Sequence, residues 1–335
     1  MTGLLEVSHL KTSFTTTEGE VTVVNDVSFT VQAGRTLAIV GESGCGKSVT
    51  ALSVMGLLAK PAGRITQGSI RFEGQELVGA TERSLQDLRG NGLSMIFQEP
   101  MTSLNPSYTI GEQIIEGLVK HRKLNRTQAR AKALEILRKV RIPSPEQRLD
   151  EFPHKLSGGM RQRVMIAMAL VCEPRVLIAD EPTTALDVTI QAQILELMRV
   201  LQLETGTAIM LITHDLGVVA EIADEVIVMY AGRVVEQAPV HTLFEWPQHP
   251  YTIGLLGAIP RLDLEQARLI AIEGQVPNPQ HPQPGCSFAP RCPFAQAACS
   301  TQIPALRQVG DQHFSACLRA PLQAELSLGP SQNMV

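Results

Sequence analysis

Residues 41–48 read Gly-Glu-Ser-Gly-Cys-Gly-Lys-Ser and fit the pattern G-x-x-x-x-G-K-S/T. An apolar run over residues 36–40 precedes this octet, and a helix-forming segment over residues 49–58 follows it. This context predicts a loop whose backbone N–H groups point at phosphate oxygens, helped by the positive end of the helix dipole. A glycine turn that merely joins a strand to a helix would not need the complete octet. We therefore expect a nucleotide site here.

Three side chains of the octet carry specific chemistry. Lys47 would neutralise the charge of the β- and γ-phosphates, and Ser48 would offer Mg²⁺ a hard hydroxyl oxygen. Cys45 would lie near the phosphates at a helix N-terminus that favours the thiolate, so we expect nucleotide-dependent activity to respond to thiol reagents. The octet residues and their neighbour expected to contact the nucleotide are Gly41, Ser43, Gly44, Cys45, Gly46, Lys47, Ser48 and Val49.

An apolar run over residues 176–179 ends in the acidic pair Asp180-Glu181. Such a pair is often only a solvated surface feature. Beside a phosphate loop, however, Asp180 can hold the magnesium shell and Glu181 can polarise an attacking water molecule. The sequence therefore predicts magnesium-dependent nucleotide hydrolysis.

Short apolar runs alternate with helical patterns and predict an α/β fold with a mainly parallel sheet. The expected strands cover residues 36–40, 176–179, 208–213 and 225–229. The strand signal disappears between residues 100 and 153, where residues 127–140 have helical periodicity, and this indicates a helical insertion. Twelve of the 21 prolines and four of the six cysteines follow Trp246, which predicts an irregular C-terminal extension.

A further motif, Leu156-Ser-Gly-Gly-Met160, places a hydroxyl and small residues at the start of a helix. This arrangement suits a γ-phosphate, and it also suits a simple helix N-cap. The ordered set of motifs over about residues 4–240 resembles the nucleotide-binding domain of ATP-binding-cassette (ABC) transporters. That set is the octet, Gln98, Leu156–Met160, Asp180-Glu181, Ala185-Leu186-Asp187 and His214.

The resemblance implies an ABC-type P-loop NTPase fold and a dimer that sandwiches two ATP molecules. Each ATP would lie between the octet of one subunit and Ser157, Gly158 and Gly159 of the other. The resemblance also implies that Gln98 contacts magnesium and water, that Glu181 is the general base, and that His214 senses the γ-phosphate. Phe14 best matches the aromatic residue that stacks on adenine. The implied magnesium ligands are Ser48, Gln98 and Asp180.

The C-terminal segments Gln248-His-Pro-Tyr-Thr252 and Gly285-Cys-Ser-Phe-Ala-Pro-Arg-Cys-Pro-Phe294 resemble the extension of dipeptide and oligopeptide importer ATPases. We therefore expect a nucleotide-binding domain over residues 1–245, with a helical subdomain at about 100–160, and the extension over residues 246–335. The resemblance of these two segments narrows the expected function to ATP-driven peptide import. Nickel or glutathione import and a soluble, non-transport ABC ATPase are the alternatives.

Four cysteines, Cys286, Cys292, Cys299 and Cys317, have the spacing C-x₅-C-x₆-C-x₁₇-C. Four soft thiolates suit an iron–sulfur cluster or zinc, and the spacing by itself also allows ordinary reduced thiols. The family resemblance favours a 4Fe–4S cluster, which we expect to act as a structural clamp or oxidation sensor. A redox regulator with a vestigial cassette is disfavoured by the intact Lys47, Asp180, Glu181 and His214.

The net charge of −4 and the lack of a polybasic run argue against nucleic acid as a partner. The longest apolar stretches fall short of the roughly 20 residues needed to span a bilayer, and the first residues lack a secretory-signal pattern. These features predict a cytoplasmic location, and the resemblance implies a peripheral position on the cytoplasmic face of the bacterial inner membrane. The resemblance implies a second, related ATPase subunit, two permease subunits and a periplasmic substrate-binding protein.

Overall fold

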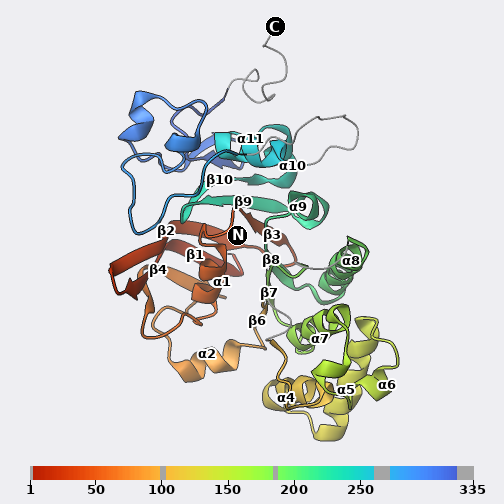
Figure 1. Ribbon diagram of the computed structural model, residues 1–335. Coiled ribbons are helices and arrows are strands. Elements are labelled where there is room, and N and C mark those ends of the chain that lie inside the picture. Colours follow the sequence, from red (N-terminus) through yellow and green to blue (C-terminus); the bar gives the residue numbers. More distant parts are fainter. Residues whose placement is uncertain (1–2, 99–102, 184–187, 260–271, 323–335) are drawn as a thin grey trace. The chain divides into compact units, whose positions relative to one another are not determined.

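The computed structural model describes residues 3–98, 103–183, 188–259 and 272–322 (Figure 1). The chain divides into two compact units, each made of segments that are separated in the sequence. The first unit contains residues 1–5, 31–36 and 72–212, and the second contains residues 6–30, 37–71 and 213–335. The sequence-based domains are continuous segments instead, and their boundary at residue 245 stays a proposal.

Parallel strands form the sheet of the first unit. β7 (Val176–Asp180) lies between β6 (Leu93–Ile96) and β8 (Ala208–Thr213), with Ile96 beside Ala179 and Asp180 beside Ile212. Every residue of these strands is buried, as expected for parallel strands that are covered on both faces. The strands predicted at 176–179 and 208–213 are therefore confirmed.

In the first unit, α4 (Ile110–Arg122) and α5 (Arg126–Lys139) pack against α7 (Gly158–Leu170), as Figure 1 shows. Two capping boxes define where α4 and α5 begin, because Thr109 and Asn125 each accept a hydrogen bond from the third helical residue, whose side chain bonds back. The helix predicted over residues 127–140 is confirmed as α5. The helical elements are α2 (Glu82–Leu88), α4 (Ile110–Arg122), α5 (Arg126–Lys139), α6 (Pro145–Arg148), η1 (Pro153–Lys155), α7 (Gly158–Leu170) and α8 (Val188–Thr205).

The second unit contains strands of two sheets. In one sheet, β1 (Leu5–Thr16) lies between β2 (Gly19–Val31) and β4 (Gly63–Phe72). In the other, β3 (Thr36–Val40) pairs in parallel with β9 (Glu225–Tyr230), which confirms the strands predicted at 36–40 and 225–229. The short strand β5 (Gln75–Glu76) belongs to the first unit.

C-terminal residues extend the β9 sheet in the antiparallel sense. β10 (Arg233–Pro239) pairs with both β9 and β12 (His313–Ser315), and β12 pairs with β11 (Arg307–Gly310). The extension therefore has more regular structure than its sequence indicates. The helices that precede the extension are α9 (Leu216–Ile222) and α10 (Val240–Glu245). The other elements of the extension are α11 (Pro250–Gly257), η2 (Ala289–Arg291) and η3 (Ala297–Ser300).

The extension shares a hydrophobic core with β3, β9 and β10. Tyr230 at the end of β9 packs against Tyr251 of α11 and Phe288, with ring centroids 4.7 and 5.2 Å away, and all three side chains are buried. These aromatic pairs add about 0.5–1.5 kcal/mol each to the area that they bury. The extension is thus part of the core of this unit.

A buried carboxylate fixes the extension to β10. Glu236 is 0% exposed, and its two oxygens accept hydrogen bonds from the backbone N–H groups of Gln248 and His249 and from Nε2 of His313 at 2.7 Å. Ser315 donates its hydroxyl to the carbonyl of Gln248 at 2.9 Å. The motif that begins at Gln248 is therefore an anchor, in which a buried charge has a partner for each oxygen.

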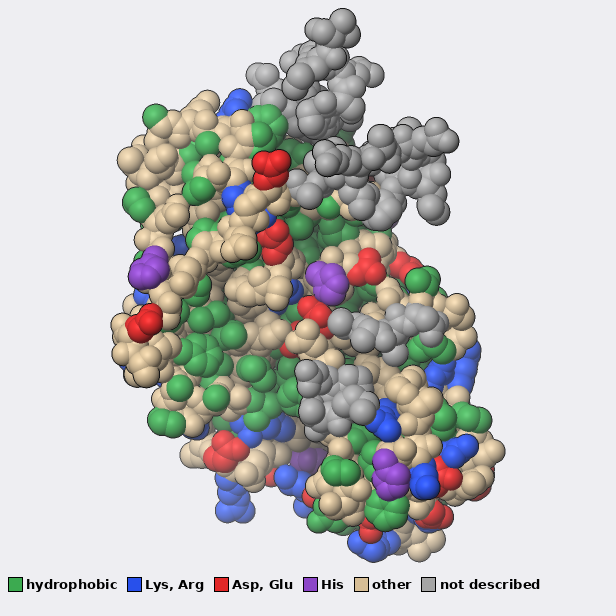
Figure 2. Space-filling model, in the orientation of Figure 1, with side chains coloured by type: hydrophobic (Ala, Val, Ile, Leu, Met, Phe, Trp, Pro, Cys, Tyr) green, Lys and Arg blue, Asp and Glu red, His purple; other side chains and the backbone are tan. Residues whose placement is uncertain are grey.

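Charged side chains of both signs are interspersed over the helices of the first unit, as Figure 2 shows. Several are paired, for example Arg130 with Asp150 at 2.7 Å and Arg138 with Glu146 at 2.5 Å. Exposed pairs of this kind contribute little to stability, about 0–1 kcal/mol each. Within the described residues, no helix is both long and apolar enough to cross a bilayer.

His249 predicts a specific acid sensitivity. Its Nδ1 accepts the backbone N–H of Tyr251 at 3.1 Å and so caps α11, and burial lowers its pKa to about 3. Because the unfolded chain takes up this proton at about pH 6.5, stability is fully present above that pH and is lost as the pH falls toward about 3. The loss is about 1.4 kcal/mol at pH 5.5 if the site acts alone.

We expect His249→Asn, which keeps a cap acceptor but cannot titrate, to lose less stability than the wild type between about pH 7.5 and about pH 5.5. Urea unfolding across this range measures the slope. The exposed His281 gives the matched control, because His281→Asn should keep the wild-type slope. Equal slopes for all three proteins would contradict the assignment.

Candidate functional site

The phosphate loop lies between β3 and α1 (Lys47–Val54), so the helix begins within the octet itself. Gly41 has φ 150°, and a Cβ there would lie 2.3 Å from the carbonyl oxygen of Met229 on the neighbouring strand. Gly46 has φ 102°, and its Cβ would lie 2.9 Å from the carbonyl oxygen of Val23. Only glycine fits at these two positions, which explains their place in the octet.

Lys47 lies folded over its own loop. Its side chain is buried, and Nζ donates hydrogen bonds to the carbonyl oxygens of Gly41 at 2.7 Å and Glu42 at 3.0 Å. A cation held at this point faces the backbone turn that the octet pattern assigns to phosphate. Phosphate oxygens would take the place of these carbonyls as acceptors for the ammonium group.

The thiol of Cys45 does not have the environment that we expect from its sequence position. The residue is 0% exposed, and burial raises the thiol pKa although Lys47 lies close, with Nζ 3.8 Å from Sγ. The Sγ atom instead fills the space beside Gly41. Desolvation therefore opposes the thiolate that the helix dipole and the ammonium charge favour.

Three candidate residues of the first unit, Gln98, Asp180 and Glu181, lie at the carboxyl ends of neighbouring parallel strands. Gln98 follows β6 and Glu181 follows β7, and Nε2 of Gln98 donates to Oε2 of Glu181 at 3.0 Å. Asp180, the last residue of β7, is buried. Parallel strands end at the same edge of a sheet, so residues far apart in the sequence meet there.

Glu181 also has an unusual backbone conformation. Its φ is 47°, in the left-handed region that residues other than glycine seldom occupy, and its N–H donates to the carbonyl of Ile212 on β8 at 2.8 Å. Strain of this kind costs of order 1–3 kcal/mol and is concentrated at functional sites. The conformation turns the carboxylate away from the strand direction and toward Gln98.

Ser157 is the N-cap of α7, and its hydroxyl accepts the backbone N–H of Met160 at 3.4 Å. Ser157 and Gly158 are exposed, and a Cβ at Gly158 would meet no atom within 4 Å. One further contact was not evident from the sequence: the buried Gln162 donates from Nε2 to the carbonyl of Pro182, just after Glu181. The start of α7 and the end of β7 are thus held together.

Besides the octet and the four C-terminal cysteines, the second unit contains the candidate residues His214 and Phe14. His214 is exposed at the end of β8, where Asp215 caps α9 by accepting the N–H of Gly217 at 2.9 Å. Phe14 is half-buried on β1, and its ring occupies the space over Gly63, where a Cβ would lie 2.8 Å from Cε1. The motif at residues 185–187 lies outside the described residues.

The four C-terminal cysteines line one cavity, together with aromatic residues and prolines. Backbone N–H groups face the sulfur atoms: Gln296 donates to Sγ of Cys299 at 3.5 Å, and Phe288 and Ala289 donate to Cys286. Similar bonds reach Cys292 from Phe294, and Cys317 from Arg319 and Ala320. Such N–H donors stabilise a thiolate or a metal-bound sulfur.

Burial nevertheless raises the pKa of Cys286 and Cys317, and it raises that of Cys292 to about 11. The neighbouring thiols raise these pKa values further, because each thiolate repels the next. Among the described residues, no three His, Cys, Asp or Glu side chains are placed to hold a single metal ion. The four thiols share one cavity.

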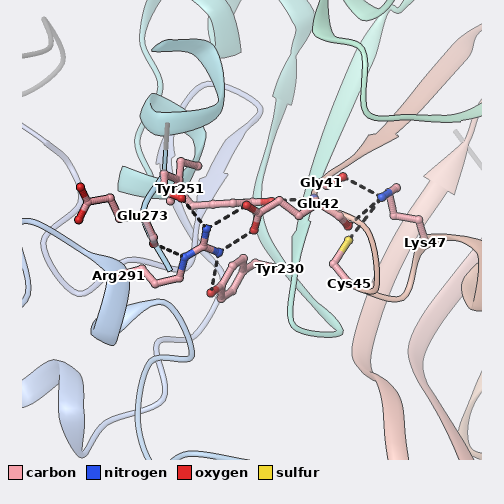
Figure 3. Close-up of polar contacts among 9 residues, drawn as sticks. Gly41, Glu42, Cys45, Lys47, Tyr230, Tyr251, Glu273 and Arg291 are labelled. Atoms are coloured by element: carbon pink, nitrogen blue, oxygen red, sulfur yellow. Dashed lines mark hydrogen bonds and ion pairs between the residues drawn. The ribbon is translucent and has the colours of Figure 1, made fainter. Parts of the chain in front are cut away.

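A second group of contacts around the phosphate loop was missed by sequence reasoning. Figure 3 shows Tyr251 and Arg291, both from the C-terminal extension, beside Glu42 of the octet. Tyr251 lies in the motif at residues 248–252, and Arg291 directly precedes Cys292. No spacing or periodicity links either residue to Glu42, because the contact depends on how the extension packs.

Two known families match the chain. Residues 24–184 match the ABC transporter family, and residues 235–299 match the oligopeptide/dipeptide transporter C-terminal region. One similar relative is the oligopeptide transport ATP-binding protein AppD of Bacillus subtilis, which is 56% identical over 91% of this chain and 93% of its own length. Another is the dipeptide transport ATP-binding protein DppD of the same strain, which is 51% identical over 97% of both chains. OppD of Salmonella typhimurium, another oligopeptide transport ATP-binding protein, is 52% identical over 94% of this chain and 93% of its own length.

Solved structures show the same fold. The dimeric ABC transporter cassette MJ0796 superposes with a TM-score of 0.64 at 25% identity, over 70% of this chain and 98% of that one. The cassette cbiO1 from Clostridium perfringens gives 0.61 at 29% identity, over 73% and 91%. With an ABC-type P-loop fold and both family regions on one polypeptide, the chain belongs to the ABC transporter ATPases that carry the oligopeptide/dipeptide transporter C-terminal region.

Proposed function

We propose that this chain hydrolyses MgATP to drive the import of dipeptides or oligopeptides across a bacterial inner membrane. The observation that carries the proposal is the presence, on one chain, of the ABC transporter family region and the C-terminal region of peptide transporters. The relatives named above are transport ATP-binding proteins for dipeptides and oligopeptides. A nickel or glutathione importer is the second candidate from the sequence, and none of these relatives supports it.

The residues of the site divide the chemistry of hydrolysis among them. Lys47 and the loop N–H groups would bind the phosphates, while Ser48 and Asp180 would hold Mg²⁺. Glu181 would accept the proton of the attacking water, and Gln98, which already contacts Glu181, would position that water. His214 would contact the γ-phosphate. The magnesium supplies electrostatic stabilisation of the transferred phosphoryl group when it is bound.

A second cassette would complete each ATP site. Ser157 and Gly158 are exposed at the N-terminus of α7, where N–H groups and the helix dipole suit an anion. The related cassette MJ0796 is described as dimeric. ATP would then close the dimer because its γ-phosphate touches both subunits, and hydrolysis would remove that contact. We infer that the second subunit is a distinct but related ATPase.

The expected membrane partners are two permease subunits, together with a periplasmic substrate-binding protein. Phe97, next to Gln98, is 41% exposed, and Tyr108 is 53% exposed. Exposed aromatic side chains of this kind suit a surface that binds a partner protein. We propose that the chain is a peripheral subunit on the cytoplasmic face of the membrane, and the family of its relatives supports this position.

We further propose that Cys286, Cys292, Cys299 and Cys317 hold a 4Fe–4S cluster. All four line one cavity, and backbone N–H groups face their sulfurs. A single zinc ion with bonds of about 2.3 Å would need the sulfurs to lie about 3.8 Å from one another. A cluster distributes four thiolates over four irons and tolerates a wider arrangement. It would act as a clamp on the extension or as an oxidation sensor.

Glu181→Gln tests the catalytic assignment. We expect ATP hydrolysis to fall at least about 100-fold while ATP binding persists, because the amide cannot accept the proton but keeps the shape of the side chain. Phosphate release and nucleotide binding by the purified transporter measure the two effects. Glu204→Gln, on the exposed face of α8, should retain activity within about twofold. Full hydrolysis by the Glu181 variant would overturn the mechanism.

Metal analysis of anaerobically purified protein tests the cluster. We expect about four iron and four sulfide per chain and a broad visible absorption. Cys292→Ala should lose the iron, whereas Cys172→Ala, a buried cysteine of the first unit, should keep it. Stoichiometric zinc, or protein without metal under these conditions, would exclude the cluster and leave the ATPase assignment intact.

A further inference from the structure

Glu42, the second residue of the octet, is held from three directions (Figure 3). Its backbone N–H donates to the hydroxyl of Tyr251 at 2.8 Å, and its carbonyl accepts from Lys47 at 3.0 Å. Its carboxylate receives both terminal nitrogens of Arg291, at 2.6 and 2.9 Å. Two of these three supports come from the C-terminal extension. A side chain of a phosphate loop is thus fixed by a part of the chain that the cassette fold does not require.

Arg291 is itself firmly placed. Its side chain is 5% exposed, and Nε and Nη2 donate to the carbonyls of Glu273 at 2.9 Å and Ile272 at 3.1 Å. Its guanidinium lies 5.8 Å from the ring centroid of Tyr230 and 6.0 Å from that of Phe288. The hydrogen bonds to Glu42 raise the pKa of Arg291, so the charge is present at all relevant pH.

We propose that Arg291 is a positioning residue for ATP binding, which neutralises Glu42 and transmits the order of the four-cysteine segment to the phosphate loop. ATP brings several negative charges to this loop, and an uncompensated carboxylate on the same turn would repel them. The bidentate guanidinium removes that repulsion and fixes the direction of the Glu42 side chain. The inference rests on ATP binding at the octet.

Arg291 contributes more to holding Glu42 in place when phosphate is bound. Lys47 contacts the carbonyls of Gly41 and Glu42, and phosphate oxygens would compete for its ammonium group. If Lys47 turns to the phosphates, the contacts from Tyr251 and Arg291 are those that continue to hold Glu42. These contacts therefore support the loop at the moment when its own lysine is engaged elsewhere.

The link to the cysteines follows from the local chain. Arg291 ends η2, and the N–H of Cys292 donates to the carbonyl of Ala289 across this turn at 3.2 Å. Cys286 and Cys292 flank the turn on either side. A change that loosens the sulfur cavity would displace Arg291 from Glu42. Oxidation of the cysteines, or loss of what they bind, would then weaken ATP binding although the octet is unchanged.

A double-mutant cycle on the full-length chain tests the proposal, with Kd for MgATP measured in the Glu181→Gln background to prevent turnover. We expect Arg291→Gln to raise Kd about tenfold, because it leaves the carboxylate unpaired beside the phosphates. Adding Glu42→Gln should bring Kd back to within about threefold of the parent, since the repelling charge is then gone. In the Glu181 wild type, Arg291→Gln should raise KM with kcat within about twofold.

Arg319→Gln is the matched control, because Arg319 lies in the same segment, 5.8 Å from the ring centroid of Phe294, and should leave Kd unchanged. Metal content is measured for every variant, and Arg291→Gln should retain that of the parent. An unchanged Kd for Arg291→Gln, or a double variant that binds as weakly as the single one, would overturn the proposal. If Arg291→Gln does not fold, the single variant Glu42→Gln tests the proposal. Its Kd for MgATP should be lower than that of the parent or unchanged. A rise of about tenfold would contradict the role of Arg291 in neutralising Glu42.

Discussion

The buried carboxylate of Glu236 is the interaction on which the arrangement of the C-terminal extension depends. It accepts hydrogen bonds from the backbone of Gln248 and His249 and from His313, and so joins β10 to two parts of the extension at once. A buried charge is tolerated only where each of its oxygens has a partner, and removing a partner costs about 3–5 kcal/mol. The carboxylate therefore specifies how the extension folds back onto the cassette strands. Tyr251 lies two residues after His249 in α11, so its position depends on this anchor.

Different physical forces hold the two groups of candidate residues. In the first unit, the common edge of parallel strands brings Gln98 to Glu181, and a strained backbone at Glu181 directs the carboxylate. In the second unit, the phosphate loop depends on close backbone packing at Gly41 and Gly46 and on contacts from the extension to Glu42. The contact between Gln98 and Glu181 thus depends on strand topology. The phosphate loop also depends on contacts from the C-terminal extension.

Because the phosphate loop depends on these contacts, the extension helps to hold the loop in place. Two side chains of the extension, Tyr251 and Arg291, contact Glu42, the second residue of the octet. A hydrogen bond to the backbone and an ion pair to the side chain restrict the same residue in complementary ways. The arrangement offers a route by which the state of the cysteines could alter ATP affinity.

Much of the local chemistry could be predicted from the sequence, because it depends on short spacings. The octet, the buried strands, the capping of α7 by Ser157 and the four thiols that share a cavity all belong to this class. The sequence did not predict that the thiol of Cys45 is buried. The helix dipole at Cys45 suggested a thiolate, whereas the folded chain desolvates the thiol and raises its pKa.

Only the tertiary structure decided which distant side chains meet. Glu42 and Arg291 are 249 positions apart, and Gln98 and Glu181 are 83 apart, so no local pattern encodes either contact. The first depends on how the extension packs against β9 and β10, and the second on which strands become neighbours. The sequence by itself therefore determined the chemical groups and their local backbone, because these follow from short-range geometry. Packing over the whole chain determined their partners and charge states, because desolvation and long-range contacts exist only in the folded protein.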